Sequence, residues 1–382
     1  MNAREAALKA LARQRRHGTR LDAALAEASK GLSPLDRALA MRLCYGVVQN
    51  RDLIDLALKD SIKKTQPQVL DILRLGAYQL WFLDRIPHRA LTDEAVRICK
   101  KTAPHAAGLV NAILRRLPEK PPETDDFSVK HSLPRWFCEK MASLLPPDEL
   151  EPFFASCNAI PPIYIQEKSG GYTLEDASIL DEVLRSGKGI VADPAARRAV
   201  ISLNPQPGMR IWDCCAAPGG KTAMSAFMMD NQGTILATDK SAEKLPMIHQ
   251  TLSRIGVTIA DIKQADAAVY TPEGLFDAVL CDVPCSGFGV LRKKPDIRYR
   301  TEVSHFPALQ LSILRNAAKA VKIGGALVYC TCTLLPEENE DVVRDFMSDD
   351  FTVESMETLW PHRGDTDGFF ICKIKKNGTS PQ

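Results

Sequence analysis

The chain has 382 residues, of which 45% are hydrophobic and 25% charged, so we expect a soluble globular protein with more than one domain. No uninterrupted apolar run is long enough to span a bilayer, which argues against a membrane role. Eleven cysteines indicate a disulfide scaffold only in a short secreted chain, and the N-terminus has no apolar signal core, so we expect reduced thiols and a cytoplasmic location.

The net charge of +2 conceals an asymmetry along the chain. Residues 1–120 carry 22 Lys and Arg against 12 Asp and Glu, a net of +10, so the remainder carries −8. A basic unit attracts polyanions, which favours nucleic acid over an acidic small molecule as the partner. Solvated helix faces would explain the same surplus, so both interpretations stay open on this observation alone.

Residues 1–120 are predicted to form an all-helical domain. Ser33 and Pro34 are typical of a helix cap and first turn. Apolar residues then recur every four positions along one face, at Leu35, Leu39, Leu43 and Val47. The stretch 117–126 combines prolines with charge and cannot continue a helix, so it is predicted to be a linker with a domain boundary near residue 120.

After residue 120 the pattern changes. Residues 121–190 mix short helical and strand-like pieces and are predicted to form the linker and a small lead-in subdomain. From 191 to 382, helical segments alternate with predicted strands at 210–214, 234–239, 260–266, 276–282 and 325–330. This alternation predicts an α/β fold with a parallel, doubly wound, Rossmann-like sheet, in which ligands bind beyond the carboxyl ends of the strands.

Candidate ligand-binding residues follow these strands. The first strand runs into a turn whose glycines would let a ligand approach the backbone beside a helix N-terminus; it consists of Cys215, Ala216, Ala217, Pro218, Gly219, Gly220 and Lys221. Asp239 ends the second strand, where an acid can accept hydrogen bonds from ribose hydroxyls. Asp266 ends the third and could bind a base. A nucleoside cofactor fits this set.

Two other interpretations of the turn compete with a nucleoside site. Gly220, Lys221 and Thr222 match the last three residues of the phosphate-binding loop of nucleotide hydrolases, but Cys215 stands where that motif needs another glycine. A turn required only for packing a helix against a strand would explain the glycines but not the acids at the next two strand ends.

Cysteines in the second half of the chain form three clusters that could in principle converge on zinc or an iron-sulfur cluster: Cys214 with Cys215, Cys281 with Cys285, and Cys330 with Cys332. Cys281 and Cys330 continue apolar strands and are expected in the core, as is Cys214. Only Cys285 and Cys332 are expected to be accessible past strand ends, too few for a structural zinc site, so no metal is predicted. Inert buried thiols remain the alternative for this pair.

Two thiols beside a methyl donor suit one reaction in particular. Carbon 5 of a pyrimidine is a poor nucleophile, but a thiolate that adds to carbon 6 turns it into an enamine-like carbon able to attack an electrophilic methyl group. An acid such as Asp282, three residues before Cys285, would protonate or hydrogen-bond nitrogen 3. A base must then remove the carbon 5 proton before the thiol is eliminated, so two cysteines with separate roles are consistent with this scheme.

Three segments resemble signature motifs of RNA cytosine-5 methyltransferases, namely 213–222, 282–291 and 331–340. The helical start resembles a NusB-type RNA-binding domain at 36–39, 45–48 and 110–116. The chain departs from the usual family residues at Cys214, Phe288, Cys330 and Thr333, which bears on fine positioning and not on the type of reaction.

The resemblance implies a role for each candidate residue. Cys332 would be the nucleophile and Cys285 would assist product release. Residues 215–221 would surround the cofactor S-adenosyl-L-methionine together with Asp239, Asp266 and Asp282. The resemblance also implies ribosomal RNA as the substrate, and no protein partner is predicted.

The basic loop 292–300 follows the second motif and is predicted to hold RNA phosphates near the thiols, unless it is simply solvated. The target base must be unstacked to admit a thiol to carbon 6, which favours a loop or bulge in RNA. A non-catalytic RNA-binding or ribosome assembly factor and a nucleotide hydrolase are the alternative functions.

Overall fold

The computed structural model describes residues 1–378, apart from 63–64, 84–85 and 301. Its contacts divide the chain into two compact units. The helical unit comprises Met1–Ala159 together with Leu291–Arg300, and the sheet unit comprises Ile160–Val290 and Thr301–Gln382. Within the segment 121–190, the part up to Ala159 therefore lies in the helical unit and the rest in the sheet unit.

The helical unit confirms the helical character predicted for the first part of the chain. Its helices are α1 (Ala3–His17), α2 (Leu21–Ala28), α3 (Pro34–Gln49), α4 (Arg51–Ala57), α5 (Lys59–Ile62), α6 (Pro67–Phe82), α7 (His88–Thr102), α8 (Ala107–Arg116), α9 (Phe127–Lys130), α10 (Arg135–Leu144) and α11 (Pro147–Ser156). The Ser33 side chain accepts a hydrogen bond from the Asp36 backbone N–H at 3.1 Å, and Pro34 opens α3, so the predicted cap is present.

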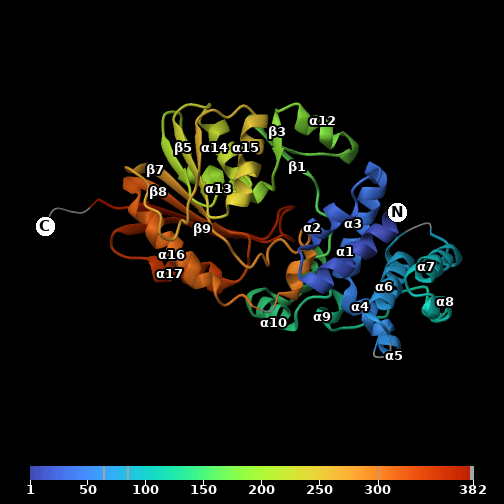
Figure 1. The fold of residues 1–382 in the computed structure, drawn as a ribbon. Coiled ribbons are helices and arrows are strands. Elements are labelled where there is room, and N and C mark those ends of the chain that lie inside the picture. Colours follow the sequence, from blue (N-terminus) through green and yellow to red (C-terminus); the bar gives the residue numbers. More distant parts are fainter. Residues whose placement is uncertain (63–64, 84–85, 301, 379–382) are drawn as a thin grey trace. The chain divides into compact units, whose positions relative to one another are not determined.

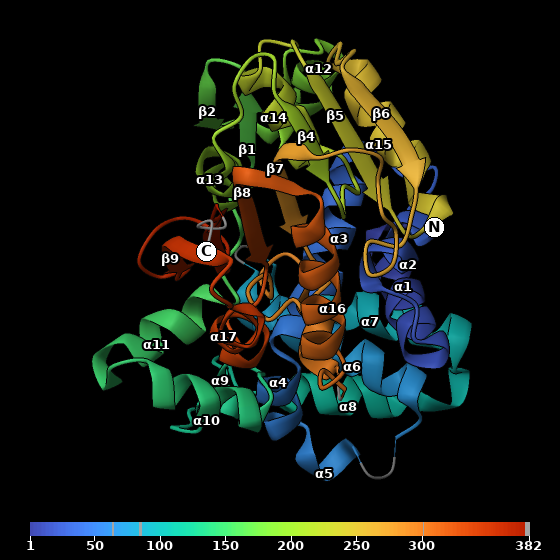
Figure 2. The same cartoon turned by 90° about the vertical axis from the view of Figure 1, so that its left-hand side faces the viewer.

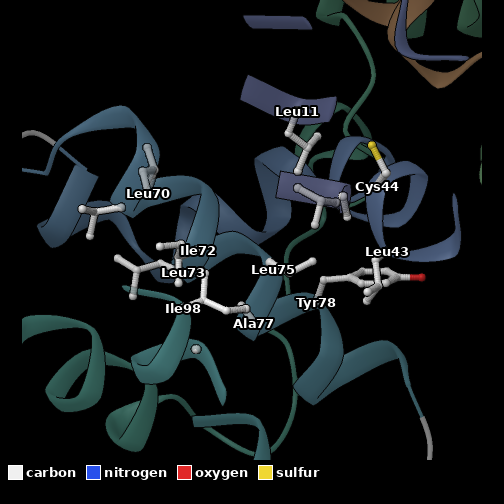
Figure 3. Close-up of a cluster of buried hydrophobic side chains, with 14 of the residues drawn as sticks. Leu11, Leu43, Cys44, Leu70, Ile72, Leu73, Leu75, Ala77, Tyr78 and Ile98 are labelled. Carbon is white, nitrogen blue, oxygen red and sulfur yellow. The ribbon is translucent and has the colours of Figure 1, made fainter. Parts of the chain in front are cut away.

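The core of the helical unit lies among α1, α3, α6 and α7 (Figure 3). Leu43 and Leu73 are fully buried there. Leu35, predicted on the same face as Leu43, is instead 85% exposed, because it lies in the first turn of α3 before the helix reaches the core. Gly46 lets α3 approach α6 closely, since a Cβ at this position would lie 1.9 Å from the Tyr78 ring.

The sheet unit begins with a small antiparallel sheet of order β2-β1-β3. Its strands are β1 (Tyr164–Glu167), β2 (Gly170–Thr173) and β3 (Gly189–Val191), and α12 (Leu180–Arg185) lies between β2 and β3 in the chain. The small sheet packs against α13 (Pro194–Leu203) and α14 (Gly220–Met228), the first helices of the main α/β fold.

A seven-stranded sheet of order β6-β5-β4-β7-β8-β10-β9 forms the centre of the sheet unit. The five predicted strands are confirmed as β4 (Arg210–Asp213), β5 (Thr234–Asp239), β6 (Ala260–Gln264), β7 (Phe276–Asp282) and β8 (Val321–Thr331), and adjacent pairs are parallel. Figure 2 shows these strands side by side. The sheet is mixed and not parallel throughout as the alternation of elements suggested, because β9 (Phe351–Leu359) and β10 (Phe369–Lys376) add an antiparallel edge.

Helices cover both faces of this sheet (Figure 1). On one face lie α13, α14 and α15 (Leu245–Arg254), and on the other lie α16 (Phe306–Lys319) and α17 (Glu340–Phe346). Neighbouring residues of β7 alternate between the two cores, with Leu280 on the first face and Val279 on the second. Within the described part of the chain, no helix combines the length and apolarity needed to cross a bilayer.

Candidate active site

The turn after β4 places residues 215–221 at the carboxyl end of a central strand of the main sheet. Gly219 has a φ of +100°, in the left-handed region that glycine adopts without strain, and it directly precedes α14. A Cβ on Gly219 would lie 3.3 Å from the Ile248 Cα, so the glycine also allows α15 to approach. The turn thus presents backbone at a helix N-terminus, as a nucleoside site of this fold requires.

Asp239 and Asp266 follow neighbouring strands, because β5 and β6 are adjacent in the sheet. The Asp239 carboxylate is 7% exposed and accepts hydrogen bonds from the backbone N–H groups of Ala217 at 3.3 Å and Ser241 at 2.9 Å. Asp266 Oδ2 lies 2.8 Å from Lys240 Nζ, and this hydrogen bond lowers the pKa of Asp266. The two predicted acids therefore lie at the carboxyl ends of their strands, as the turn does. Asp239 also hydrogen-bonds to that turn.

Lys221 forms a close ion pair with Asp282, the last residue of β7. Lys221 Nζ lies 2.5 Å from Asp282 Oδ2 and 5.2 Å from the centre of the Phe369 ring. Burial alone would lower the pKa of Lys221, but the charge and hydrogen bond of Asp282, together with nearby Cys330 and Asp213, outweigh it and the pKa is raised. Lys221 is thus paired with the end of β7, whereas the lysine of a nucleotide hydrolase binds phosphates.

Cys285 and Cys332 are brought together by two adjacent strands, although 47 residues separate them in sequence. Cys332 directly follows β8, and Cys285 lies three residues beyond the end of β7. Their Sγ atoms are 3.1 Å apart, and both thiol side chains are partly exposed. Contact with Cys332 and burial raise the pKa of Cys285 well above its ordinary value.

The loop that carries Cys285 is held by buried polar side chains. Our sequence analysis did not identify them. Glu338 Oε2 accepts hydrogen bonds from the Ser286 backbone N–H at 2.9 Å and from Gln310 Nε2 at 2.8 Å. Gln310 Nε2 also donates to the Pro284 carbonyl at 3.0 Å. The residues on both sides of Cys285 are therefore fixed. Glu338 is 1% exposed, yet it lies in an acidic turn that a sequence pattern assigns to the surface.

The segment around Cys332 is held by a second set of hydrogen bonds. Thr331 Oγ1 donates to Asn339 Oδ1 at 2.6 Å, and Asn339 Nδ2 donates to the Thr333 carbonyl at 3.0 Å. The Thr333 and Ser286 hydroxyls are 2.9 Å apart and link the two cysteine loops. Thr333, where serine is usual in the family that the motifs resemble, thus keeps a hydroxyl that the site uses.

Cys214, Cys281 and Cys330 are packing residues, as predicted, whereas Cys215 of the turn is partly exposed. Cys281 and Cys330 are fully buried, and Cys214 is 1% exposed. Burial raises the pKa of Cys330 well above its ordinary value. Among the described residues, no three His, Cys, Asp or Glu side chains are grouped so that they could hold a metal ion.

Two residues of the basic loop 292–300 were wrongly predicted to be RNA contacts. Arg292 is 5% exposed and Arg298 is 2% exposed, and both lie within the helical unit. The Arg298 guanidinium donates to three main-chain carbonyls of that unit. Side chains buried in this way cannot reach a phosphate. Of the remaining basic residues, Lys294 and Arg300 are exposed.

Comparisons with known proteins agree with both units of the chain. The model of the 16S rRNA methyltransferase RsmB/F family matches residues 200–375, and that of the NusB family matches residues 1–119. A Bacillus subtilis protein named "Probable ribosomal RNA small subunit methyltransferase B" is 32% identical over 415 residues, which cover 92% of this chain and 93% of that protein.

Solved structures show the same likeness. The crystal structure of PH0851 aligns with a TM-score of 0.81 and 25% identity over 98% of each chain. The structure of NSun6 from Pyrococcus horikoshii with SFG aligns with a TM-score of 0.50 and 29% identity over 55% of this chain and 60% of that one. With a NusB domain followed by a Rossmann-like methyltransferase domain, and a relative 32% identical along nearly its whole length, the chain belongs to the RsmB/F family of rRNA methyltransferases.

Proposed function

We propose that this protein methylates carbon 5 of a cytosine in small-subunit ribosomal RNA through a covalent cysteine adduct at carbon 6. The observation that carries the proposal is the pair of thiols 3.1 Å apart at the carboxyl ends of β7 and β8, next to the ion pair of Asp282 and Lys221. A thiol for addition and a second group for proton removal are what this reaction needs. The cytoplasmic location predicted from the sequence is consistent with this substrate.

The family's cofactor is S-adenosyl-L-methionine, and the turn at 215–221 is built to receive it. Gly219 has no side chain to keep a ligand away from the backbone. The Asp239 carboxylate is hydrogen-bonded to the same turn, and its oxygens can accept hydrogen bonds from ribose hydroxyls. Asp266 at the neighbouring strand end is suited to the base. The cofactor supplies an electrophilic methyl group for the activated carbon 5.

The two thiols are assigned different tasks. Cys332, as thiolate, forms the bond from Sγ to carbon 6, which places negative charge on the ring and activates carbon 5. Nitrogen 3 takes a proton from solvent as the charge develops and returns it when the thiol is eliminated. Asp282 accepts a hydrogen bond from the protonated nitrogen 3, while Lys221 balances the charge of the carboxylate. After methyl transfer, Cys285 gives its own proton to solvent and, as thiolate, takes the carbon 5 proton. The electrons of that carbon–hydrogen bond re-form the double bond to carbon 6, the carbon 6 to sulfur bond breaks, and Cys332 leaves as thiolate. The raised pKa of Cys285 suits a group that ends the cycle holding a proton.

The alternative functions are less well supported. In a nucleotide hydrolase the loop lysine must meet phosphates, whereas Lys221 is held by Asp282 here. A non-catalytic assembly factor needs no paired thiols fixed by buried hydrogen bonds, such as those of Glu338 and Asn339.

The proposal is tested by following covalent RNA adducts on a denaturing gel. Wild type, Cys285→Ala and Cys332→Ala are incubated with S-adenosyl-L-methionine and unmethylated small-subunit ribosomal RNA. We expect an adduct to accumulate with Cys285→Ala and to be absent with Cys332→Ala. Cys372→Ala, a buried cysteine of β10, serves as the matched control and should resemble wild type. The reverse pattern would exchange the two roles, and no methyl transfer by wild type would favour a non-catalytic RNA-binding protein.

A further inference from the structure

A short segment that follows the Cys285 loop in sequence is built into the helical unit. Leu291–Arg300 belongs to the helical unit although the residues on both sides belong to the sheet unit. We call residues 291–300 the strap; it contains the single 3-10 turn Pro295–Tyr299 and begins six residues after Cys285. The mechanism described above gives the strap no task.

Arg298 anchors the strap in the interior of the helical unit. Its Nη1 donates to the carbonyls of Gln49 at 3.1 Å, His131 at 3.1 Å and Ser132 at 3.0 Å. Its Nη2 donates to the Asn158 side-chain oxygen at 2.9 Å. These acceptors follow or end α3, α9 and α11, so one guanidinium cross-links three segments of the helical unit.

Neighbouring residues of the strap add further anchors. The Tyr299 hydroxyl donates to the Val48 carbonyl at 2.9 Å, and the Arg51 guanidinium lies 4.8 Å from the centre of the Tyr299 ring. Asp296 Oδ2 accepts a hydrogen bond from the Leu21 backbone N–H at 3.2 Å. The anchors thus involve both polar and aromatic contacts along successive residues.

This construction is costly to undo. A buried guanidinium is tolerated only when its donors are satisfied, and Arg298 is 2% exposed with acceptors on both terminal nitrogens. Pulling the strap out would also leave buried carbonyls of the helical unit without this donor. The strap therefore stays in place for as long as the helical unit is folded.

The other end of the same loop is tied to the sheet unit. The Gly289 N–H donates to the Cys332 carbonyl at 2.9 Å, and the Gly289 carbonyl accepts a hydrogen bond from the Gly368 N–H at 2.8 Å. Val290, next in sequence, is 8% exposed and Leu291 is 1% exposed. Gly289 is hydrogen-bonded within the sheet unit, and Leu291 is the first strap residue in the helical unit. Only Val290 lies between them, so the connection is short.

We propose that the helical unit positions the Cys285 loop through the strap, with Arg298 as the positioning residue. The helical unit is then part of the machinery that holds the catalytic loop, in addition to any role in binding RNA. The proposal rests on the proposed function only for the task of Cys285 in releasing the product.

The test loosens the strap in the full-length protein without removing either unit. One variant carries a Gly-Gly-Ser-Gly insertion between Val290 and Leu291, and a second carries Arg298→Met. The control receives the same insertion between Glu119 and Lys120, two exposed residues of the helical unit. Each protein is assayed for S-adenosyl-L-methionine affinity, for turnover on ribosomal RNA, for RNA adducts and for the rate at which iodoacetamide alkylates Cys285 without RNA.

If the strap positions Cys285, the Val290 insertion leaves cofactor affinity within about twofold of wild type but lowers turnover by about tenfold or more. It also accumulates an adduct as Cys285→Ala does, which simple loss of folded protein would not produce, and Cys285 is alkylated about tenfold faster. Arg298→Met shifts the same readouts in the same direction, and the control insertion changes none of them.

Wild-type turnover and alkylation in the Val290 insertion would overturn the proposal, whatever Arg298→Met does to stability. The alkylation rate needs no RNA, so it decides the positioning role even if Cys285→Ala forms no adduct. That last result would instead contradict the release role assigned to Cys285 under the proposed function.

Discussion

At the scale of single residues, the chemistry depends on side chains that do not themselves react. Cys285 is placed by Glu338, whose carboxylate binds the Ser286 N–H and Gln310, and both partners lie in the same buried network. Because the network is buried, a lost partner there leaves unpaired polar groups, which costs more than a lost hydrogen bond at the surface. The partly exposed sulfur atoms are thus positioned by a buried network of hydrogen bonds.

Asp213 provides a test of electrostatics next to the turn at 215–221. It is 2% exposed, and burial raises its pKa to about 7 although the Thr222 hydroxyl donates to it at 2.6 Å. Above about pH 4 the unfolded chain ionises this carboxyl while the folded protein keeps it protonated, so stability is lost as the pH rises toward 7. Each unit of pKa shift is worth about 1.4 kcal/mol, so the whole effect is on the order of a few kcal/mol.

We therefore expect Asp213→Asn to flatten the fall in unfolding free energy between about pH 4 and pH 7 relative to wild type. Urea titrations of both proteins at several pH values measure this. If the unfolding free energy of wild type changed with pH by the same amount as that of the variant, Asp213 would ionise normally in the folded protein.

At the scale of elements, the site is made where loops from three strand ends meet. The loop after β7 carries Cys285 and Gly289, β8 ends before Cys332, and the segment before β10 contributes Gly368. These loops approach so closely that a Cβ on Gly289 would lie 2.0 Å from the Gly368 carbonyl oxygen and 2.9 Å from that of Cys332. The antiparallel strand β10 is therefore part of the site's construction and not only an edge of the sheet.

Gly289→Ala should separate these loops. We expect a loss of about 1–3 kcal/mol in unfolding free energy from overpacking and a fall in methyl transfer of up to about 100-fold from misplacement of the thiols. Gly364→Ala, where a Cβ would meet nothing within 4 Å, is the matched control. Thermal unfolding and single-turnover methyl transfer measure the two effects. Equal behaviour of the two variants would count against close packing at Gly289.

At the scale of the whole molecule, charge is divided along the sequence. Residues 1–120 carry a net charge of +10, whereas the rest of the chain carries −8. Binding of RNA by Lys and Arg releases counterions and is weakened by salt, whereas a small cofactor held mainly by hydrogen bonds is not bound through this effect. The two ligands of the proposed reaction should therefore respond differently to ionic strength.

We expect the affinity for ribosomal RNA to fall by about tenfold or more between 50 and 200 mM salt, and that for S-adenosyl-L-methionine to change by less than about twofold. Filter binding and calorimetry measure the two affinities. Replacing the exposed Arg115 and Arg116 of α8 by glutamine should reduce the salt slope if either contacts RNA. An RNA affinity that does not vary with salt would contradict a basic RNA-binding unit.

The sequence alone determined the features that depend on nearby residues. The cap at Ser33, the helices of the first unit and the five parallel strands arise from spacings of a few positions, and so does the placement of Cys285 and Cys332 after strand ends. Strand β9 was missed because much of it is exposed and shows no regular alternation, and β10 was not predicted with it. The motifs predicted the family because they are short and contiguous.

Only the tertiary structure decided how these parts meet. The approach of the two sulfur atoms to 3.1 Å and the pairing of Lys221 with Asp282 join residues far apart in sequence. Glu338 and Arg298 are the clearest cases, because an acid in a charged turn and an arginine in a basic loop both suggest exposure to solvent, yet each is buried and hydrogen-bonded to distant segments. Local patterns report what a residue prefers, whereas burial and partners are set by the segments that fold around it.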